Sequence, residues 1–318
     1  MLTTLSVALG FALDTIFGDP DGAWHPVCAI GALISKTEKL LRRLFPQTPR
    51  GEKIAGVVLW CIVCAVSYTV PFAILFLLRA ANPWLAFAAE TLFCYQIFAR
   101  KCLMQAGEKV YTALSQSLAE GRKAISYYVG RDTGSLTEEG VIKAAVETIA
   151  ENTTDGVISP MIYLMLGGPV LGMGFKAAST LDSMVGYLDE KYRDIGWSSA
   201  RLDDVLNYVP ARLCALLLCA SAWFLGLDAR GAWRIVRRDH ANHKSPNCAW
   251  SEAAAAGALG IQLGGTHLYF GKPVEKPTIG DALRPATSGM IRQTCRLMTV
   301  ATLLAAGICA ACALGIAL

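Results

Sequence analysis

Apolar runs without charge divide the chain, and polar segments connect them. The clearest run is 54–78, a second one is 297–318, and 83–99 forms a third that contains a single acid, Glu90. A helix needs about 20 mostly apolar residues to cross the hydrocarbon core of a membrane. We therefore predict membrane segments near these three runs. We also predict a retained membrane helix at 1–17, which lacks the basic start and cleavage site of a signal peptide.

Two further apolar stretches, 156–175 and 207–227, are less regular. The first is rich in Gly and contains two prolines, and the second contains Pro210 and Arg212. Irregular backbone is tolerated at membrane depth only where protein or a water-filled cavity covers it. Each stretch therefore fits either a full span or a re-entrant or buried helix.

Strand signals are nearly absent, and neither a repeat nor a low-complexity linker interrupts the chain. The pattern predicts an all-α fold, a polytopic integral membrane protein with polar helices facing the cytoplasm, in a single helical domain over residues 1–318. Between residues 100 and 152 we expect two soluble helices joined near Gly130. A capping box of Ser135 and Glu138 should open the second helix.

Composition supports a membrane protein and limits its partners. The chain is 54% hydrophobic and 17% charged, with a net charge of +4. Basic residues gather at 36–53 and 230–238, and the positive-inside rule places both segments in the cytoplasm and both termini outside. No arginine-rich run with interleaved aromatic residues suggests a nucleic acid partner.

The most informative polar feature is an acid cluster that precedes residues 156–175. Glu147, Glu151 and Asp155 follow one another at i, i+4 spacing, so on an α-helix they project from one face and repel one another. A bound cation or a positively charged partner would relieve this repulsion. A solvated acidic face at a helix end has the same spacing, so the pattern alone leaves both interpretations open.

Asp14, Asp19 and His25 form a second polar group at the end of the first apolar run. Proline disfavours α geometry in the residue before it, so Pro20 and Pro26 should break the helix and present these side chains together. A structural hydrogen bond from His25 and a functional role fit this pattern equally.

A third group is a polar stripe within residues 176–194. Lys176, Thr180, Ser183 and Tyr187 recur at helical spacing on one face, with Asp182 beside them. An amphipathic surface helix explains the charged end of the segment well, but it explains the Ser, Thr and Lys face poorly.

Two more groups suit phosphate chemistry. Asp203, Asp204 and Asn207 offer the oxygen ligands that Mg²⁺ prefers, and Arg212 follows them. A stripe of Arg230, Arg234 and Arg237 suits a phosphate or an anionic lipid headgroup. It precedes Ser245-Pro246, which resembles an N-cap with Pro at the first helical position. Free backbone N–H groups at such a helix start would form an anion site with His243 and Asn247.

The order of these groups resembles the CbiB/CobD family, the membrane-bound adenosylcobinamide-phosphate synthases of cobalamin biosynthesis. The resemblance extends over most of the chain and rests on these elements: FGDP, HPV..IG, GRDT, VETIAENT.DG, TLDSMVGY, EKY, ARLDDV.NY.PAR, SPNCAWSEA and GIQLGG. Two positions depart from the family pattern. Ser179 replaces Asn before Thr-Leu-Asp, and Thr266 replaces Pro after Gly-Gly, which puts in doubt only a direct role for position 179.

The resemblance implies ATP-dependent amide ligation. Adenosylcobyric acid would be joined through a corrin propionate to (R)-1-aminopropan-2-ol or its O-phosphate, giving adenosylcobinamide or its phosphate. ATP and Mg²⁺ are the implied cofactors, because the carboxylate must be activated, as an acyl phosphate. The implied location of the protein is the inner cell membrane, with the active site facing the cytoplasm. Membrane lipids and other late cobalamin-assembly enzymes are the further expected partners.

The site residues follow from the groups and motifs above. The expected catalytic residues are Glu147, Glu151, Asp182, His25 and His243, with either histidine as the base for the amine. Substrate and phosphate binding is expected from Asn152, Lys176, Thr180, Ser183, Tyr187, Lys191, Arg212, Arg237, Ser245 and Asn247. Mg²⁺ is expected at Asp155, Asp203 and Asp204, and the remaining polar set is Asp14, Asp19 and Asn207.

Two other classes of protein also place charged residues beside apolar segments. A small-molecule transporter would do so, but no inverted repeat or pair of broken helices is visible in the sequence. A non-catalytic membrane sensor or assembly subunit is the other alternative, although it would not need so many polar residues between 147 and 207.

Overall fold

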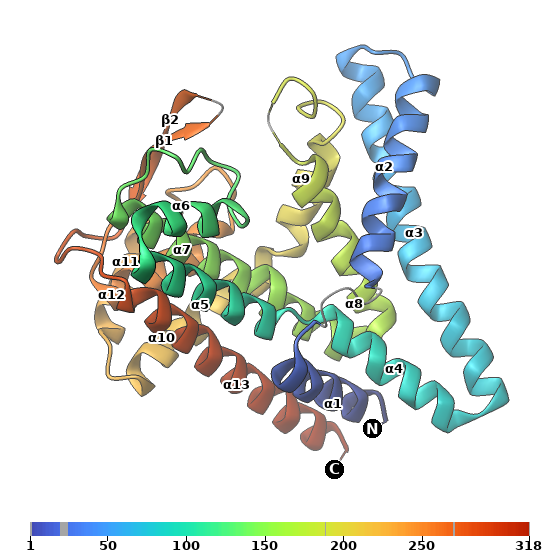
Figure 1. The fold of residues 1–318 in the computed structure, drawn as a ribbon. Coiled ribbons are helices and arrows are strands. Elements are labelled where there is room, and N and C mark those ends of the chain that lie inside the picture. Colours follow the sequence, from blue (N-terminus) through green and yellow to red (C-terminus); the bar gives the residue numbers. More distant parts are fainter. Residues whose placement is uncertain (1, 20–24, 188, 270, 318) are drawn as a thin grey trace. The chain divides into compact units, whose positions relative to one another are not determined.

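The computed structural model of the chain describes residues 2–19, 25–187, 189–269 and 271–317. In these residues helices dominate, and two short strands form a hairpin (Figure 1). The all-α prediction is therefore confirmed, with one hairpin that it did not include. Contacts within the chain define two compact units, of which unit 1 comprises Met1–Ala99, Ser159–Asn207 and Cys309–Leu318 and unit 2 comprises Arg100–Ile158 and Tyr208–Ile308. The single domain over 1–318 stays a prediction.

In the described residues, unit 1 is built mainly from six helices, and three of them begin at a proline that the sequence shows directly. They are α1 (Leu2–Phe17), α2 (Pro26–Leu44), α3 (Pro49–Ala81), α4 (Pro83–Ile97), α8 (Ser159–Val185) and α9 (Trp197–Leu206). The helices α2, α3 and α4 each begin with a proline that follows an N-cap residue, namely His25, Thr48 or Asn82. Proline suits the first helical position because its missing N–H would have no partner there.

Unit 2 contains the remaining helices and the hairpin. They are α5 (Arg100–Gln116), α6 (Leu118–Ser126), α7 (Glu138–Thr153), the π-helical turn η1 (Thr154–Ile158), α10 (Tyr208–Phe224), α11 (Ala229–Asp239), α12 (Cys248–Leu259), β1 (Leu263–Tyr269), β2 (Lys272–Ile279) and α13 (Gly289–Ala317), which belongs to this unit up to Ile308.

Two predictions for residues 100–152 were wrong in detail. Three helices form there, because Ser117 caps α6 by accepting a hydrogen bond from the Glu120 N–H at 3.1 Å. The N-cap of α7 is Thr137 and not Ser135, since the Thr137 hydroxyl accepts from the Gly140 N–H at 3.1 Å. A hydroxyl at the right distance from the third helical N–H decides each helix start.

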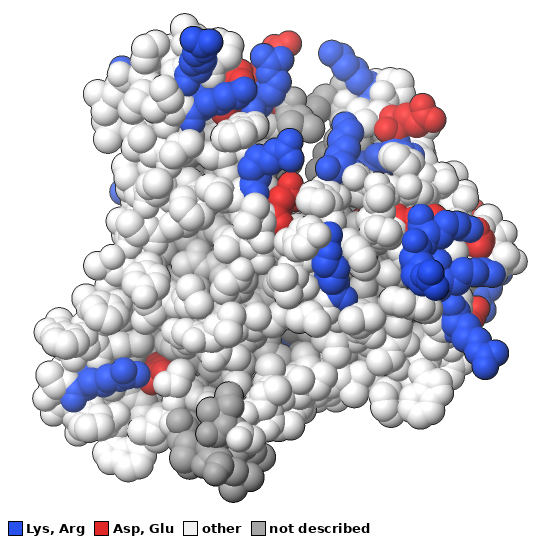
Figure 2. All heavy atoms as spheres, turned by 180° about the vertical axis from the view of Figure 1, so that it is seen from behind, with Lys and Arg blue, Asp and Glu red and all other residues white. Residues whose placement is uncertain are grey.

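Several helices are suited to a membrane. Among the described residues, three helical stretches are long and apolar enough to cross one: Pro49–Ala81, Glu138–Val185 and Gly289–Ala313. Together α9 and α10 form a fourth candidate that is bent by 51°. The predicted runs 54–78 and 297–318 lie on α3 and α13, and α3 exposes many large apolar side chains, including Phe72 and Phe76. Figure 2 shows the same trend, since much of the face in view carries no charged side chain.

The other predicted spans are shorter or broken. α4 has 15 residues and α1 has 16. The stretch 156–175 is not one straight helix, because Gly167 and Gly168 leave helical geometry just before Pro169, with Gly168 at φ +63°. This break agrees with the Gly and Pro content that made the stretch irregular in the sequence.

The helix α12 forms the core of unit 2. All of its residues from Ser251 to Leu259 are buried, and most of them are Ala or Gly, so α7, α10 and α11 can pack closely against it. The closest approach is at Gly257, where a Cβ atom would lie 2.6 Å from both the Ala232 Cα and the Gly231 carbonyl oxygen of α11.

We expect Gly257→Ala to destabilise the protein by about 1–3 kcal/mol, since the added methyl group meets backbone that cannot rotate away. Thermal unfolding in detergent, followed by circular dichroism, measures the effect. Gly307→Ala is the matched control, because a Cβ there meets nothing within 4 Å. An unchanged unfolding temperature for Gly257→Ala would contradict the close packing of α11 and α12.

Candidate functional site

A buried ion pair joins α7 to the loop before it in unit 2. The Glu147 carboxylate is bonded through Oε2 to Arg131 Nη2, and its Oε1 accepts from the Gly264 N–H at 2.9 Å. The Arg131 and Glu147 side chains are 7% and 8% exposed. A buried charge is costly unless it is paired and hydrogen-bonded, so these two donors allow Glu147 to remain ionised.

The β1–β2 hairpin brings the Gly264 donor to this ion pair. The strands are antiparallel, and their register shifts between Leu263 and Gly265, which places Gly264 at a bulge. Its φ is +75°, and a Cβ atom there would lie 2.3 Å from the Pro277 carbonyl oxygen. Only glycine adopts this geometry without strain.

The loop that carries Arg131 is tied to the same hairpin. The Asp132 N–H donates to the Leu268 carbonyl at 2.8 Å, and the Asp132 carboxylate accepts from the Gly271 N–H at 2.7 Å. Arg131 Nη1 also lies 3.0 Å from His267 Nε2. Burial and the charge of Arg131 lower the pKa of His267, so this ring stays neutral and accepts the guanidinium N–H.

A third carboxyl group, that of Glu252 on α12, lies near Glu147 and Glu151. The Cys248 thiol contacts Glu151 Oε1 at 3.0 Å, which sets this face of α12 against α7. Glu252 lies one turn further along the same face and is 6% exposed. Burial, and then the negative charges of Glu147 and Glu151, raise the pKa of Glu252 well above its ordinary value.

His243, a predicted base, lies in the same electrostatic environment. Its Nδ1 accepts a hydrogen bond from the Ser245 N–H at 3.1 Å, so the neutral ring carries its proton on Nε2. Burial and the positive charge of Lys276 lower the pKa of His243. Their effect is larger than that of the negative charges of Glu151 and Glu147, which raise it. A neutral ring in this tautomer is a hydrogen-bond donor at Nε2, which does not favour the role of a base.

The predicted helix start at Ser245 was wrong. The Ser245 hydroxyl accepts from the Asn247 N–H at 3.2 Å within a turn, and α12 begins only at Cys248. Asn247 Oδ1 instead accepts from Arg212 Nη1 at 3.1 Å. Arg237 lies on the exposed face of α11, where it lines a shallow hollow with Arg230, Trp233, Arg234 and Arg238.

Arg212 is held between two aromatic rings. Its guanidinium carbon lies 3.4 Å from the Tyr208 ring centroid and 4.7 Å from that of Trp250. With the Asn247 bond, these contacts fix the segment before α12 against α10. The observed role of Arg212 is thus to position this segment.

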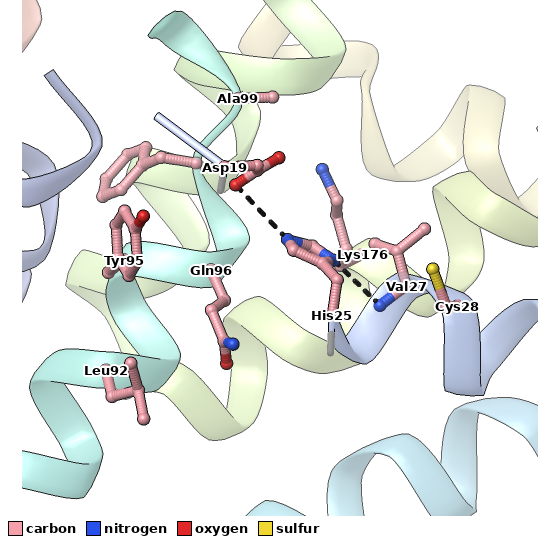
Figure 3. Close-up of a pocket in the computed structure, with 10 residues that line it drawn as sticks. Asp19, His25, Val27, Cys28, Leu92, Tyr95, Gln96, Ala99 and Lys176 are labelled. Atoms are coloured by element: carbon pink, nitrogen blue, oxygen red, sulfur yellow. Dashed lines mark hydrogen bonds and ion pairs between the residues drawn. The ribbon is translucent and has the colours of Figure 1, made fainter. Parts of the chain in front are cut away.

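Unit 1 contains a cavity of about 580 Å³ that joins two of the predicted groups. Asp19 and His25 line it from the segment between α1 and α2, and Lys176 lines it from α8 (Figure 3). Tyr95 and Gln96 of α4 add further polar groups. The sequence predicted these residues in separate groups, and the fold of unit 1 brings them into one cavity.

His25, the other predicted base, has a fixed tautomer as well. As the N-cap of α2 it accepts from the Val27 N–H through Nδ1 at 3.2 Å, and its Nε2 lies 3.5 Å from Asp19 Oδ1 (Figure 3). The neutral ring therefore directs an N–H toward Asp19 and acts as a donor. Asp14 is buried in α1 and is not among the described residues that line the cavity. Pro20, which we expected to break the helix, lies outside the described residues.

The polar stripe on α8 is only partly formed. The helix ends at Val185, so Tyr187 lies beyond it. The Thr180 and Ser183 hydroxyls donate to carbonyl groups one turn earlier at 2.7 and 2.9 Å. Hydroxyl groups in helices often bond in this way, and here it directs both of them to their own backbone.

Asp182 and Lys191 are likewise engaged near the end of α8. A Cβ atom at Gly186 would lie 1.9 Å from Asp182 Oδ1, so this carboxylate fills the space that the glycine opens. The exposed Lys191 ammonium lies 4.2 Å from the Tyr192 ring centroid. Neither residue is among the described residues that line the cavity with Lys176.

The predicted Mg²⁺ residues lie in different units. In unit 1 the Asn207 amide donates to Asp203 Oδ2 at 2.9 Å and accepts from the Ser159 hydroxyl at 2.6 Å; Asp204 follows on α9 and is half-buried. Asp155 belongs to unit 2. In the part of the chain that the structure describes, no group of three or more His, Cys, Asp or Glu side chains is placed to hold a metal ion.

The row of acids expected on one face is interrupted. Glu147 and Glu151 lie on α7, but Asp155 lies in η1. The turn of a π-helix is wider than that of an α-helix. The Asp155 charge still acts on the Cys248 thiol together with those of Glu151 and Glu252, so Asp155 stays near the carboxyl groups of unit 2. Asn152 is exposed, and its amide donates to the Thr148 carbonyl at 2.9 Å.

Sequence reasoning missed four residues of the unit 2 site. Arg131 lies in the GRDT element and Glu252 in SPNCAWSEA, so both belonged to recognised motifs without an assigned role. His267 and Lys276 lie on the hairpin, which was not predicted. The missing signal was spatial, because residues more than a hundred positions apart meet around Glu147.

Comparison with known proteins identifies the family. The family described as CobD/Cbib protein matches residues 7–298. The chain belongs to this family. It is 48% identical over 305 residues to cobalamin biosynthesis protein CobD of Citrobacter koseri, covering 96% of this chain and 95% of that one. Cobalamin biosynthesis protein CbiB of Salmonella typhi is 47% identical, with the same coverage of both chains. CobD of Photorhabdus laumondii is 46% identical, over 93% of this chain and 92% of its own. No solved structure matches the chain.

We expect Glu252→Gln to flatten the dependence of stability on pH. The raised pKa of Glu252 means that the folded protein keeps a proton that the unfolded chain has lost. The contribution of this group is fully present below the unfolded pKa of about 4.3, and it falls by about 1.4 kcal/mol per pH unit until the folded pKa is passed. Above about pH 5, the unfolding temperature of the wild type should therefore fall more steeply with rising pH than that of the variant.

The control for this prediction is Glu275→Gln, which removes an exposed carboxylate of β2 in the same unit. Its stability curve should follow the wild type. Parallel curves for wild type and Glu252→Gln would contradict the raised pKa.

Proposed function

We propose that the chain takes part in cobalamin biosynthesis as an ATP-dependent amide ligase. It would join adenosylcobyric acid to (R)-1-aminopropan-2-ol or its O-phosphate. The observation that carries this proposal is the set of three neighbouring carboxyl groups, of which Glu147 and Glu252 are buried and Glu151 is half-buried. The names of the relatives and the sequence motifs support the substrate class.

Amide formation requires that the amine is bound and that it loses a proton, and the three carboxyl groups suit both steps. An amine approaches as a cation, which carboxylates bind, and it must lose a proton before it can attack a carbonyl carbon. A non-catalytic sensor or assembly subunit would gain nothing from burying Glu147 and Glu252 beside Glu151, since buried charges cost stability unless they are fully paired.

ATP and Mg²⁺ belong to the proposal as cofactors. Mg²⁺ is commonly held by one or two carboxylates together with the phosphates of a nucleotide. The candidates for such a partial shell are Asp203 and Asp204 in unit 1 or, separately, Asp155 in unit 2. When bound, the ion would neutralise charge on the phosphoryl oxygens. Arg131 and Lys276 supply positive charge of the protein's own in unit 2.

We place the protein in the inner cell membrane with several spans and the active site toward the cytoplasm, where ATP is available. The basic segments 36–53 and 230–238 support this orientation through the positive-inside rule. Membrane lipids and other late cobalamin-assembly enzymes are the proposed partners besides the substrates.

Glu151→Gln should abolish ligation while the protein stays in the membrane, because the change removes one charge from the cluster but keeps its shape. The assay supplies detergent-purified protein with ATP, Mg²⁺, adenosylcobyric acid and the amino alcohol or its phosphate, and it measures the amide product by chromatography. Glu138→Gln, at an exposed position of the same helix, should keep wild-type activity. Turnover by Glu151→Gln at the wild-type rate would refute the assignment.

A cysteine at position 183 tests the orientation. Ser183 is exposed on α8, so Ser183→Cys, in a background without other reactive cysteines, should react with an impermeant thiol reagent only after the cells are permeabilised. Labelling of intact cells from outside would contradict the proposed cytoplasmic orientation of this segment.

A further inference from the structure

Glu252 is the one carboxyl group of the unit 2 cluster that has no bonded partner. It is 6% exposed, and it forms no hydrogen bond or ion pair with any residue that the structure describes. Glu147, by contrast, is bonded to Arg131 and Gly264, and Glu151 to the Cys248 thiol. A buried polar group without a partner is uncommon in folded proteins and calls for an explanation.

Charged groups face Glu252 from three elements. Burial raises the pKa of Glu252, and the negative charges of Glu147 and Glu151 on α7 raise it further. The positive charges of Lys276 on β2 and of Arg131 in the loop before α7 lower it. Arg131 is already bonded to Glu147 and to His267. Lys276 interacts with Tyr269, and its ammonium lies 5.8 Å from that ring centroid. Neither cation is paired with Glu252.

The other helices that pack against α12 bring no charge that could neutralise Glu252. On α10, Arg212 is stacked between two rings and bonded to Asn247. On α11, Asp239 is bonded to Arg238 and to the Gly280 N–H. No cation among the described residues is thus paired with Glu252, and its carboxyl group is open to a cation from outside the chain.

An ammonium group fits this site better than a metal ion. A metal ion held by the protein alone needs several ligands at fixed distances, and the described residues contain no group of three or more His, Cys, Asp or Glu side chains placed for one. An alkylammonium ion has three N–H donors and needs only nearby acceptors. The carboxylates of Glu252 and Glu151 are such acceptors, and they come from two facing helices.

We propose that Glu252 binds the ammonium group of the amino-alcohol substrate and removes its proton before the amine attacks. This assignment rests on the proposed function. The histidines do not compete for the role, since His243 and His25 each use Nδ1 to accept a backbone N–H and carry a proton on Nε2 when neutral. A carboxyl group with a raised pKa is a stronger base than an ordinary one once it is ionised.

The ammonium nitrogen gives one proton to a Glu252 carboxylate oxygen, and its lone pair forms the C–N bond to the activated carbonyl carbon. The bond between this carbon and the phosphate oxygen breaks, and the phosphate leaves with that electron pair. The second proton of the nitrogen leaves with the phosphate, so the products are the amide, hydrogen phosphate and protonated Glu252.

Binding of (R)-1-aminopropan-2-ol to the purified full chain in detergent tests the proposal without any turnover. In the wild type, binding should tighten as pH rises and should release close to one proton per ligand, as calorimetry in buffers of different ionisation enthalpy reports. Glu252→Gln should weaken binding about tenfold or more, since a charge-assisted hydrogen bond is lost. It should also abolish the proton release.

Two variants separate this role from a general loss of structure. Glu275→Gln should bind the amine like the wild type. Glu252→Asp keeps the charge and should retain pH-coupled binding with reduced affinity. Wild-type affinity and proton release in Glu252→Gln would overturn the proposal. If the wild type binds the amine in this way but never forms the amide, the ammonium site stands and the proposed ligase function fails.

Discussion

The architecture of unit 2 depends on one constraint, the burial of the Glu147 carboxylate. A carboxylate away from water must be matched by donors, and three separate pieces of the chain supply or hold them. The loop at 130–132 brings Arg131, the bulge in β1 brings the Gly264 N–H, and Asp132 ties the loop to the hairpin. The hairpin is therefore best understood as a support for the ion pair, which explains why a helical protein keeps two strands.

Once Glu147 is paired, the remaining acids differ sharply in their environments. Glu151 is half-buried and contacts a thiol, whereas Glu252 is buried and unbonded among the described residues. Carboxyl groups in such different surroundings are typical of acid and base roles in enzymes. The two histidines with predicted catalytic roles are not suited to act as bases. The Nδ1 atom of His25 caps a helix and that of His243 closes a tight turn, so each already accepts a backbone N–H. In unit 1, His25 lies beside Asp19, and both line the cavity to which Lys176 adds a positive charge.

Much of the fold could be predicted from the sequence, and the reasons are local. The apolar runs of α3 and α13, the proline-initiated helices and the broken stretch at Gly167 and Gly168 all follow from residues close in the chain. The site could be predicted only in part. Glu147 and Glu151 were found because they share one helix face, but Arg131, Glu252 and His267 come together through long-range packing that no spacing rule reveals. The π-helical turn at Asp155, and the turn that delays the start of α12 beyond Ser245, also depend on competing hydrogen bonds that the motifs do not encode.

A structure of the protein with adenosylcobyric acid, (R)-1-aminopropan-2-ol and a non-hydrolysable ATP analogue, determined by electron cryo-microscopy, tests the central claim most directly. We predict that the amine nitrogen lies within hydrogen-bond distance of the Glu252 carboxyl group, with the Arg131–Glu147 pair intact beside it. An amine bound instead in the cavity of Asp19, His25 and Lys176, with Glu252 still buried and without a ligand, would contradict the account.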